Sequence, residues 1–161
     1  VYLSDRKGAQ AGKCARTTNR IRHITSTVLS EKLRSRLNTA ETTLHDAVSF
    51  EKVLELQRRA DILVHVEGLS LKERLDVAHS FSTKIVDYLQ QCKPIFVVGK
   101  DDCASIRYFT DNDSGIVAQN YDEIVRKLTA VAASPEILED YAEKAWTCGE
   151  KNHRKSIHQR H

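Results

Sequence analysis

The residues of this chain with the most suggestive chemistry follow one another in the stretch HSFSTKIVD, residues 79–87. It holds three hydroxyl side chains, a cation and an acid: Ser80, Ser82, Thr83, Lys84 and Asp87. At the start of a helix, the hydroxyls, the lysine and the free backbone N–H groups could together bind a phosphate group. Asp87, one turn further into the helix, could accept hydrogen bonds from the neighbouring hydroxyls of a ribose. Phosphate and ribose together predict a nucleotide ligand.

A simpler interpretation of the same stretch needs no ligand. Ser82 or Thr83 would cap the helix, Lys84 would be solvated, and Asp87 would complement the positive end of the helix dipole. The spacing alone favours neither interpretation.

The surrounding sequence alternates between expected strands and helices. The runs DILVHV (61–66) and IFVVG (95–99) are apolar without period-two alternation, which is typical of parallel strands buried on both faces, and SGIVAQ (114–119) predicts a third short strand. The pattern predicts an α/β fold with a doubly wound parallel sheet, Rossmann-like and forming a single domain. The carboxyl ends of the strands would share one edge, where such folds bind ligands. The loop that begins at Glu67 would leave this edge and lead into a helix over residues 82–91.

Capping residues mark the other expected helices. Ser49 precedes a helix over residues 50–60, with one face formed by Phe50, Val53 and Leu54. Asn120 and Glu123 form a capping-box pattern, and the apolar stripe of the helix that follows is expected to be Ile124, Val125, Leu128 and Val131. Residues 134–136, Ser-Pro-Glu, predict the start of a last helix.

Composition limits the classes of protein to consider. The chain has 161 residues, of which 40% are hydrophobic and 29% are charged, as suits one globular domain. It has no apolar run near the ~20 residues of a membrane span and no signal-peptide pattern. The four cysteines show no metal-ligand spacing, so we expect reduced thiols in a cytoplasmic protein. His65, inside an apolar run, is expected to be a core histidine with a polar partner.

Basic residues are concentrated in residues 1–36 and from Lys151 onward. They could contact phosphorylated ligands or anionic lipid, while the lack of interleaved aromatic residues argues against nucleic acid. We expect residues 1–41 to be a basic, poorly legible part of the domain, residues 42–150 to be its Rossmann-like part, and residues 151–161 to be a disordered basic tail. A metal site in that tail is the less favoured alternative; its ligands would be His153, His158 and His161.

Four stretches, in this order along the chain, are similar to the motifs of one protein family: HDAVSFEKVLELQRRADILVHVE, FSTKIVDYLQQCKPIFVVG, DNDSGIVAQNYDEIVRKL and LEDYAEKAWTCGEKNH. The second is similar to the family pattern SKxxEYLxxGKPIxxxG. From about residue 42 to residue 153, the chain thus resembles the C-terminal, donor-binding domain of a GT-B glycosyltransferase, of the broad retaining family that uses nucleotide sugars. Cys92 stands where the pattern has glycine, which we interpret as a packing difference only.

The resemblance implies a donor site around residues 79–87. The family has two glutamates eight positions apart in this segment. His79 stands in the place of the first, near the transferred sugar, and Asp87 in the place of the second, which contacts the ribose. The backbone of the intervening segment matches the family's diphosphate loop, which adds four expected donor-binding residues: Ser80, Phe81, Ser82 and Thr83. His79 and Lys84 would be the catalytic residues, the lysine by stabilising the departing diphosphate.

Other donor contacts are implied outside this segment. Glu67 begins the loop that leads to it and is expected to bind the donor. Val48 would offer backbone atoms to the base. Arg6 and Lys7 would neutralise the diphosphate in the place of the family's basic pair.

The implied reaction is transfer of a sugar from a nucleotide sugar to an acceptor hydroxyl, in the synthesis of a bacterial-type surface glycan or glycolipid. No cofactor or metal is expected, since the Asp-x-Asp match at Asp111-Asn112-Asp113 precedes Ser-Gly in a turn, where local capping is its expected role. An N-terminal acceptor domain would be needed for turnover, and the protein would be cytoplasmic, with possible peripheral contact at the inner face of the membrane.

Two other classes remain for comparison. A response-regulator receiver is disfavoured because Lys93-Pro94 precedes a strand instead of following one, and because an early acidic pair is missing. A non-catalytic α/β domain that binds a nucleotide or a protein stays open as the main alternative.

Overall fold

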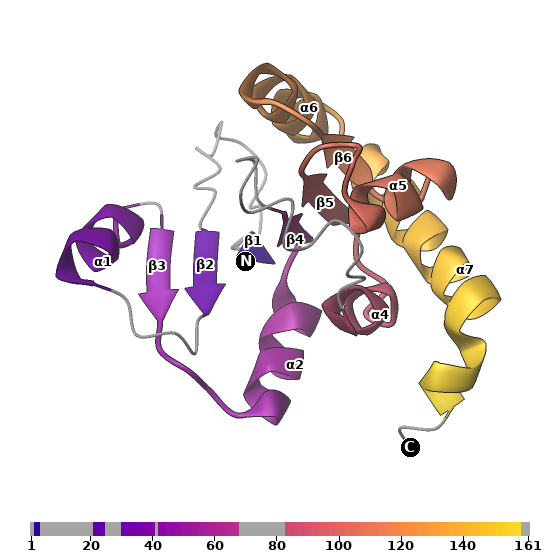
Figure 1. Cartoon of the computed structure of the whole chain (residues 1–161), viewed down its shortest axis with the longest axis horizontal. Helices are drawn as coiled ribbons and strands as arrows, with labels where there is room; N and C mark the ends of the chain where they lie inside the picture. The colour runs from indigo at the N-terminus through magenta and orange to yellow at the C-terminus, as the bar shows by residue number, and fades with distance from the viewer. Residues whose placement is uncertain (1, 4–20, 25–29, 41, 68–82, 159–161) are drawn as a thin grey trace, which may run out of the picture. The chain divides into compact units, whose positions relative to one another are not determined.

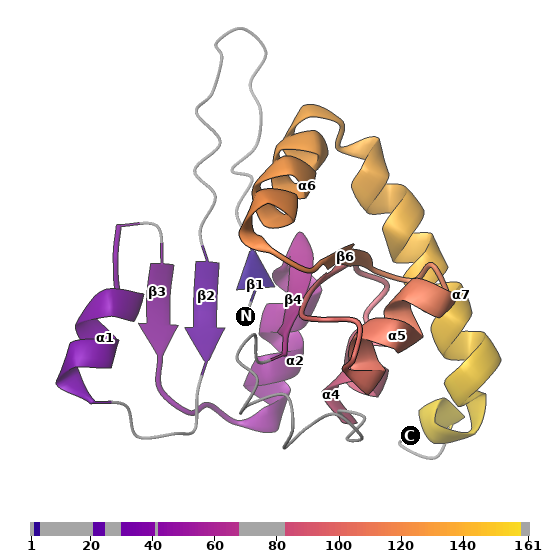
Figure 2. The ribbon, with the colours of Figure 1, turned by 45° about the horizontal axis from the view of Figure 1, so that its top comes forward.

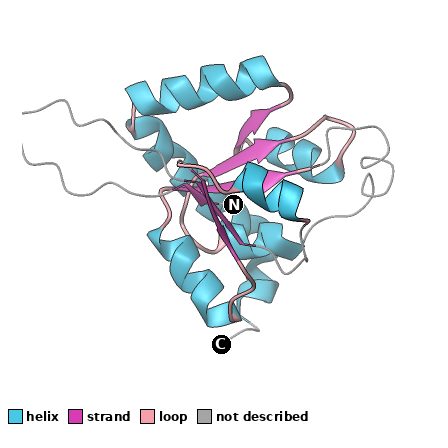
Figure 3. Cartoon of the chain, turned by 90° about the vertical axis from the view of Figure 1, so that its left-hand side faces the viewer, coloured by secondary structure: helices cyan, strands magenta, loops and turns pink. Residues whose placement is uncertain are grey.

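The computed structural model describes residues 2–3, 21–24, 30–40, 42–67 and 83–158. It is an α/β structure in which helices connect short strands, most of them parallel (Figures 1 and 3). The α/β class predicted from the sequence is therefore confirmed. The chain divides into two compact units, Val1–Asp61 and Ile62–His161.

The described residues of the first unit form three short strands and two helices. In chain order they are β1 (Tyr2–Leu3), β2 (Ile21–Ile24), α1 (Glu31–Leu37), β3 (Thr42–His45) and α2 (Phe50–Arg59). Strand β1 pairs antiparallel with β2, with Tyr2 opposite Arg22. Strands β2 and β3 are parallel, and α1 packs against β3.

Helix α2 begins where the sequence predicts. The Ser49 hydroxyl accepts a hydrogen bond from the Lys52 N–H at 3.3 Å, which satisfies one of the free donors of the first turn. Phe50, at the first helical position, is 58% exposed and does not join a buried face. The buried side chain of this helix is instead Gln57.

In its described residues the second unit alternates between strand and helix from β4 (Ile62–Val66) to α6 (Tyr121–Ala133), and a further helix, α7 (Glu136–His158), follows α6 directly. The described elements between β4 and α6 are α4 (Thr83–Leu89), β5 (Ile95–Val98), α5 (Ala104–Asp111) and β6 (Ile116–Ala118). All three strands are parallel and adjacent in chain order, with Leu63 opposite Ile95 and Phe96 opposite Ile116. Parallel neighbours need a crossover connection, and the helices supply it.

The core of the second unit forms around β5, whose four residues are all buried. Helix α5 contacts β5 and β6 through Ile106 and Phe109, which lie three positions apart on one helix face and are fully buried. Helix α4 buries Ile85 and Leu89 and packs against α7, which also contacts β5. Helices α5 and α7 lie side by side (Figure 2).

Helix α6 confirms the capping box but corrects the predicted stripe. The Asn120 side chain accepts a hydrogen bond from the Glu123 N–H at 2.9 Å, and the Glu123 carboxylate accepts one from the Gln119 N–H at 3.0 Å. Val125 is 46% exposed, next to Tyr121 one turn earlier, which is 76% exposed. The inward stripe is Ile124, Leu128 and Val131, because only these follow the i, i+4, i+7 spacing of one helix face.

Helix α7 continues through His158, so residues 151–158 are helical where the sequence predicts a disordered tail. The helix is kinked at His153, which has φ −131° and ψ 15°. The His153 Nε2 atom lies 2.9 Å from the Tyr108 hydroxyl of α5, and this hydroxyl also lies 3.1 Å from the Cys148 sulfur. These contacts hold α7 on α5 at the kink. Within the described part of the chain no helix, α7 included, is both long enough and apolar enough to cross a membrane.

The kink gives a first testable prediction, on pH. Burial lowers the pKa of His153 below its ordinary 6.5, so the unfolded chain binds more protons than the folded one once the pH falls below about 6.5. Acidification from pH 8 to pH 5.5 is therefore expected to lower the melting temperature of the wild type more than that of His153→Gln, which has no titrating group at this position. Thermal unfolding followed by circular dichroism measures both profiles, and parallel profiles would contradict the prediction.

Candidate functional site

The carboxyl ends of β4 and β5 lie side by side and carry the polar residues of the candidate site. The Glu67 N–H donates to the Val98 carbonyl at 2.8 Å, and the Gly99 N–H donates to the Ala118 carbonyl at 3.1 Å. The sheet ladder thus extends one residue past β4 and past β5. Glu67 is held by this ladder at the edge where open parallel sheets bind ligands.

The Glu67 carboxylate is part of a buried polar cluster. Its Oε1 atom lies 2.9 Å from His65 Nε2 and accepts a hydrogen bond from Ser105 Oγ at 2.5 Å. The side chains of His65 and Glu67 are 9% and 11% exposed, and Ser105 is fully buried. His65 is therefore a core histidine with a polar partner, as the sequence predicts.

Gly99 lets β5 approach this cluster closely. A Cβ atom at position 99 would lie 3.0 Å from the Glu67 Cβ and 2.7 Å from the Ile106 Cδ1. A larger residue would push against both α5 and the glutamate. Glycine at the end of β5 is thus what allows the glutamate and α5 to pack together.

Helix α5 supplies Ser105 because it begins directly after this edge. Cys103 occupies its N-cap position without a side-chain capping bond, and Ser105 lies in the first turn. Burial raises the pKa of the Cys103 thiol above its usual range, which disfavours the reactive thiolate, and the residue is part of the buried core. Sequence reasoning missed Ser105 and Gly99; the available signal was a serine in the first turn of a helix that follows a buried strand.

Most of the predicted donor loop lies outside the described residues. Six predicted site residues lie outside the described residues, four of them in the loop and two near the N-terminus: His79, Ser80, Phe81, Ser82, Arg6 and Lys7. Their proposed contacts stay predictions. Thr83 is the first residue of α4.

The remaining predicted residues lie in two different units. Lys84 is exposed and Asp87 is half-buried on α4, and the Asp87 carbonyl accepts a hydrogen bond from Gln91 Nε2 at 3.4 Å. Val48 is 38% exposed in the first unit, directly before the Ser49 cap. The cluster of His65, Glu67 and Ser105 was therefore not among the groupings that the motif similarity implies.

Cys92 is more than a packing difference. It has φ 51°, in the left-handed region that glycine adopts without strain. The family pattern has glycine at this position, three residues after the last residue of α4.

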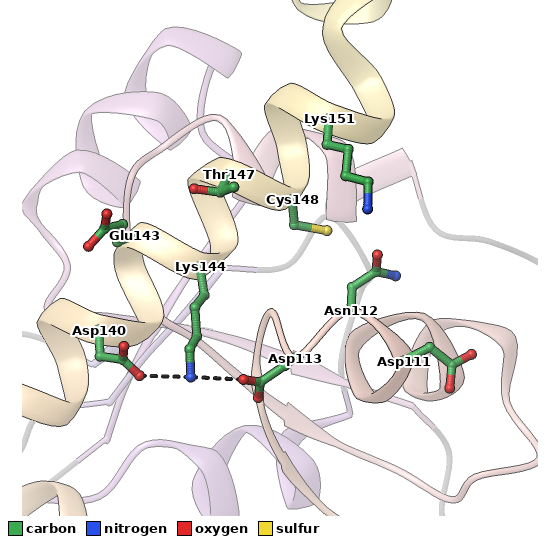
Figure 4. Close-up of a pocket in the computed structure, with 9 residues that line it drawn as sticks. All are labelled: Asp111, Asn112, Asp113, Asp140, Glu143, Lys144, Thr147, Cys148 and Lys151. Atoms are coloured by element: carbon green, nitrogen blue, oxygen red, sulfur yellow. Dashed lines mark ion pairs between the residues drawn. The ribbon is translucent and has the colours of Figure 1, made fainter.

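A cavity of about 420 Å³ lies between α7 and the end of α5 (Figure 4). Lys144 lies inside it between Asp113 Oδ2 at 2.8 Å and Asp140 Oδ2 at 2.9 Å, and these bonds raise its pKa. Asp113 lines the cavity and precedes β6, so the cavity lies near the amino end of that strand and not at the carboxyl edge that carries Glu67. The pair with Asp113 bonds α7 to the turn after α5, whereas the pair with Asp140 is an i,i+4 contact within α7.

No family model and no curated protein matches the chain. Within the described ranges, no group of three or more His, Cys, Asp or Glu side chains could hold a metal ion. Cys92, Cys103 and Cys148 are free thiols. Function therefore has to be argued from the carboxyl edge of the sheet.

Proposed function

We propose that the chain is the donor-binding domain of a retaining, nucleotide-sugar-dependent glycosyltransferase with a doubly wound, Rossmann-like fold. The observation that supports this best is the place of the Glu67 carboxylate, at the shared carboxyl edge of three parallel strands joined by helices. This edge is the usual ligand site of open α/β sheets. The motif similarity of residues 42–153 adds the substrate class.

In this proposal the donor lies between the edge of the sheet and the start of α4. The backbone of residues 80–83 and the exposed Lys84 bind the diphosphate, and Asp87 binds the ribose. Sugar transfer leaves a nucleoside diphosphate whose negative charge grows in the transition state. Oriented N–H groups and a lysine stabilise that charge without a metal. Acceptor binding is assigned to a further, N-terminal domain.

The proposal includes the cellular compartment in which the reaction takes place. Free thiols at Cys92, Cys103 and Cys148 fit a reducing compartment, and we place the protein in the cytoplasm. Basic residues at both ends could hold it at the inner face of a membrane, where surface glycans or glycolipids are built.

Calorimetric titration of the chain with UDP, GDP, ADP and CDP, and with UDP-glucose and GDP-mannose, tests the binding half of the proposal. We expect one base to bind measurably. Asp87→Ala should weaken that binding by more than tenfold, since a charge-assisted bond to a ligand hydroxyl contributes about 1.5–3 kcal/mol. Asp111→Ala, an exposed acid at the end of α5, is the matched control and should bind as the wild type does.

Two results would count against the proposal. The first is the absence of heat with every nucleotide. The second is an Asp87→Ala variant that binds normally and differs from the wild type only in thermal stability. The second result would favour a non-catalytic α/β interaction domain.

A further inference from the structure

We infer that Glu67 binds a pair of neighbouring hydroxyls on the ligand through its Oε2 atom, and that Ser105 and His65 are positioning residues for this carboxylate. The inference rests on the proposed function, because it assigns a contact within the same donor site. It adds the ligand group that Glu67 contacts and two positioning residues, His65 and Ser105, to which the motif similarity does not point. The ligand group it names is a vicinal diol.

The two oxygens of the Glu67 carboxylate differ in the number of hydrogen bonds that they accept within the cluster. Both bonds from His65 and Ser105 end on Oε1. No bond from a described residue reaches Oε2. An ionised carboxylate has about four lone-pair sites, so the glutamate keeps acceptor capacity after both internal bonds are made.

The residues around Glu67 also fix the position of its carboxylate, and with it the position of the Oε2 atom. The Glu67 N–H is bonded to Val98, Gly99 packs against the glutamate Cβ, and Ser105 is held in the first turn of α5. Two strands and a helix therefore determine the position of one carboxylate. A group held this rigidly binds a ligand with little loss of conformational entropy.

The chemistry of the carboxylate sets the class of ligand group. A carboxylate only accepts hydrogen bonds, so the ligand has to donate. In a nucleotide sugar the neutral donors in neighbouring pairs are the hydroxyls of the ribose and those of the transferred sugar. Both are vicinal diols, and the experiment below distinguishes them.

Glu67→Gln is the decisive variant. The glutamine keeps one oxygen for Ser105 and His65 but has an NH₂ group, a donor, in the place of Oε2. The probes are the nucleoside diphosphate that binds the wild type best, its 2′-deoxy form and its nucleotide sugar. We expect Glu67→Gln to lose more than about tenfold in affinity for the form that carries the diol, with a melting temperature close to that of the wild type. Glu139→Gln, an exposed acid on α7, is the control.

The probes tell the two diols apart. If Glu67 binds the ribose beside Asp87, Glu67→Gln reduces the preference of the protein for the ribose form over the 2′-deoxy form. If Glu67 binds the transferred sugar, only the nucleotide sugar loses affinity in the variant. Ser105→Ala should reduce the same preference between forms by about three- to tenfold, because it leaves the carboxylate less well oriented. A purely structural role for Ser105 would change stability without changing that preference.

The outcomes separate the inference from the proposed function. The inference alone is overturned if the wild type binds a nucleotide and a folded Glu67→Gln variant binds each of the three forms with the affinity of the wild type. A wild type that binds none of the nucleotides overturns both. If Glu67→Gln does not fold, the wild type decides: equal affinity for the diphosphate, its 2′-deoxy form and its nucleotide sugar contradicts the inference.

Discussion

Replacing Phe109 by alanine is expected to lower the free energy of unfolding by about 3–5 kcal/mol, the usual cost of truncating a buried phenylalanine. Phe109 is fully buried on α5. Its ring lies edge-on to that of Tyr108 at 5.7 Å and 6.4 Å from the ring of His65. Alanine would leave a cavity between α5 and the sheet that rigid strands cannot close. Urea unfolding followed by circular dichroism measures the change.

Tyr121→Ala is the matched control for Phe109→Ala. Tyr121 is also aromatic and in a helix, but it is 76% exposed, so its loss should change stability by less than about 0.5 kcal/mol. Equal effects of the two substitutions would show that α5 does not pack as described. Because Ser105 lies one turn before Phe109 on the same helix, Phe109→Ala should also weaken nucleotide binding.

Gly115→Ala is expected to be the second strongly destabilising change, by about 1–3 kcal/mol. The new Cβ would lie 2.8 Å from the Phe109 Cδ1, 3.0 Å from the Val97 Cγ2 and 3.2 Å from the Ile95 carbonyl oxygen. Phe109 and Val97 are fully buried and cannot move away without disturbing the core. The same urea titration measures the loss.

Gly149→Ala in α7 provides the comparison for Gly115→Ala. Its Cβ would meet Leu89 Cβ at 3.0 Å, a milder contact. Alanine also favours the helix over glycine by about 0.5–1 kcal/mol, which offsets that contact. We expect a change near zero, and a larger loss at position 149 than at position 115 would contradict this account of the packing.

Phe109→Ala and Gly115→Ala test the packing of α5, and the Glu67 and Ser105 variants test the ligand contact that this packing supports. Phe109, Gly115 and Ile106 fix α5 on β5 and β6, and α5 carries Ser105 to the glutamate. The stability of the core therefore sets the precision of the candidate site. We therefore expect a substitution in the core to weaken nucleotide binding even though the substituted residue does not contact the ligand.

Local sequence determined the elements of the second unit. Apolar runs without alternation gave β4 and β5, Asn120 with Glu123 gave the start of α6, and Pro94 gave the boundary before β5. These features depend on hydrogen bonds and backbone preferences within a few residues, so a single sequence contains them. The position of Glu67 at the carboxyl edge follows from the same patterns, because parallel strands place their ends together.

Only the tertiary structure decided which side chains meet at that edge. Ser105 lies 38 positions from Glu67, and no periodicity links the two residues. The exposure of Val125 and the helical continuation of α7 past residue 151 likewise depend on which faces other elements cover. The physical reason is that burial and side-chain hydrogen bonds are set by packing between distant segments, whereas strands, caps and turns are set by neighbours along the chain.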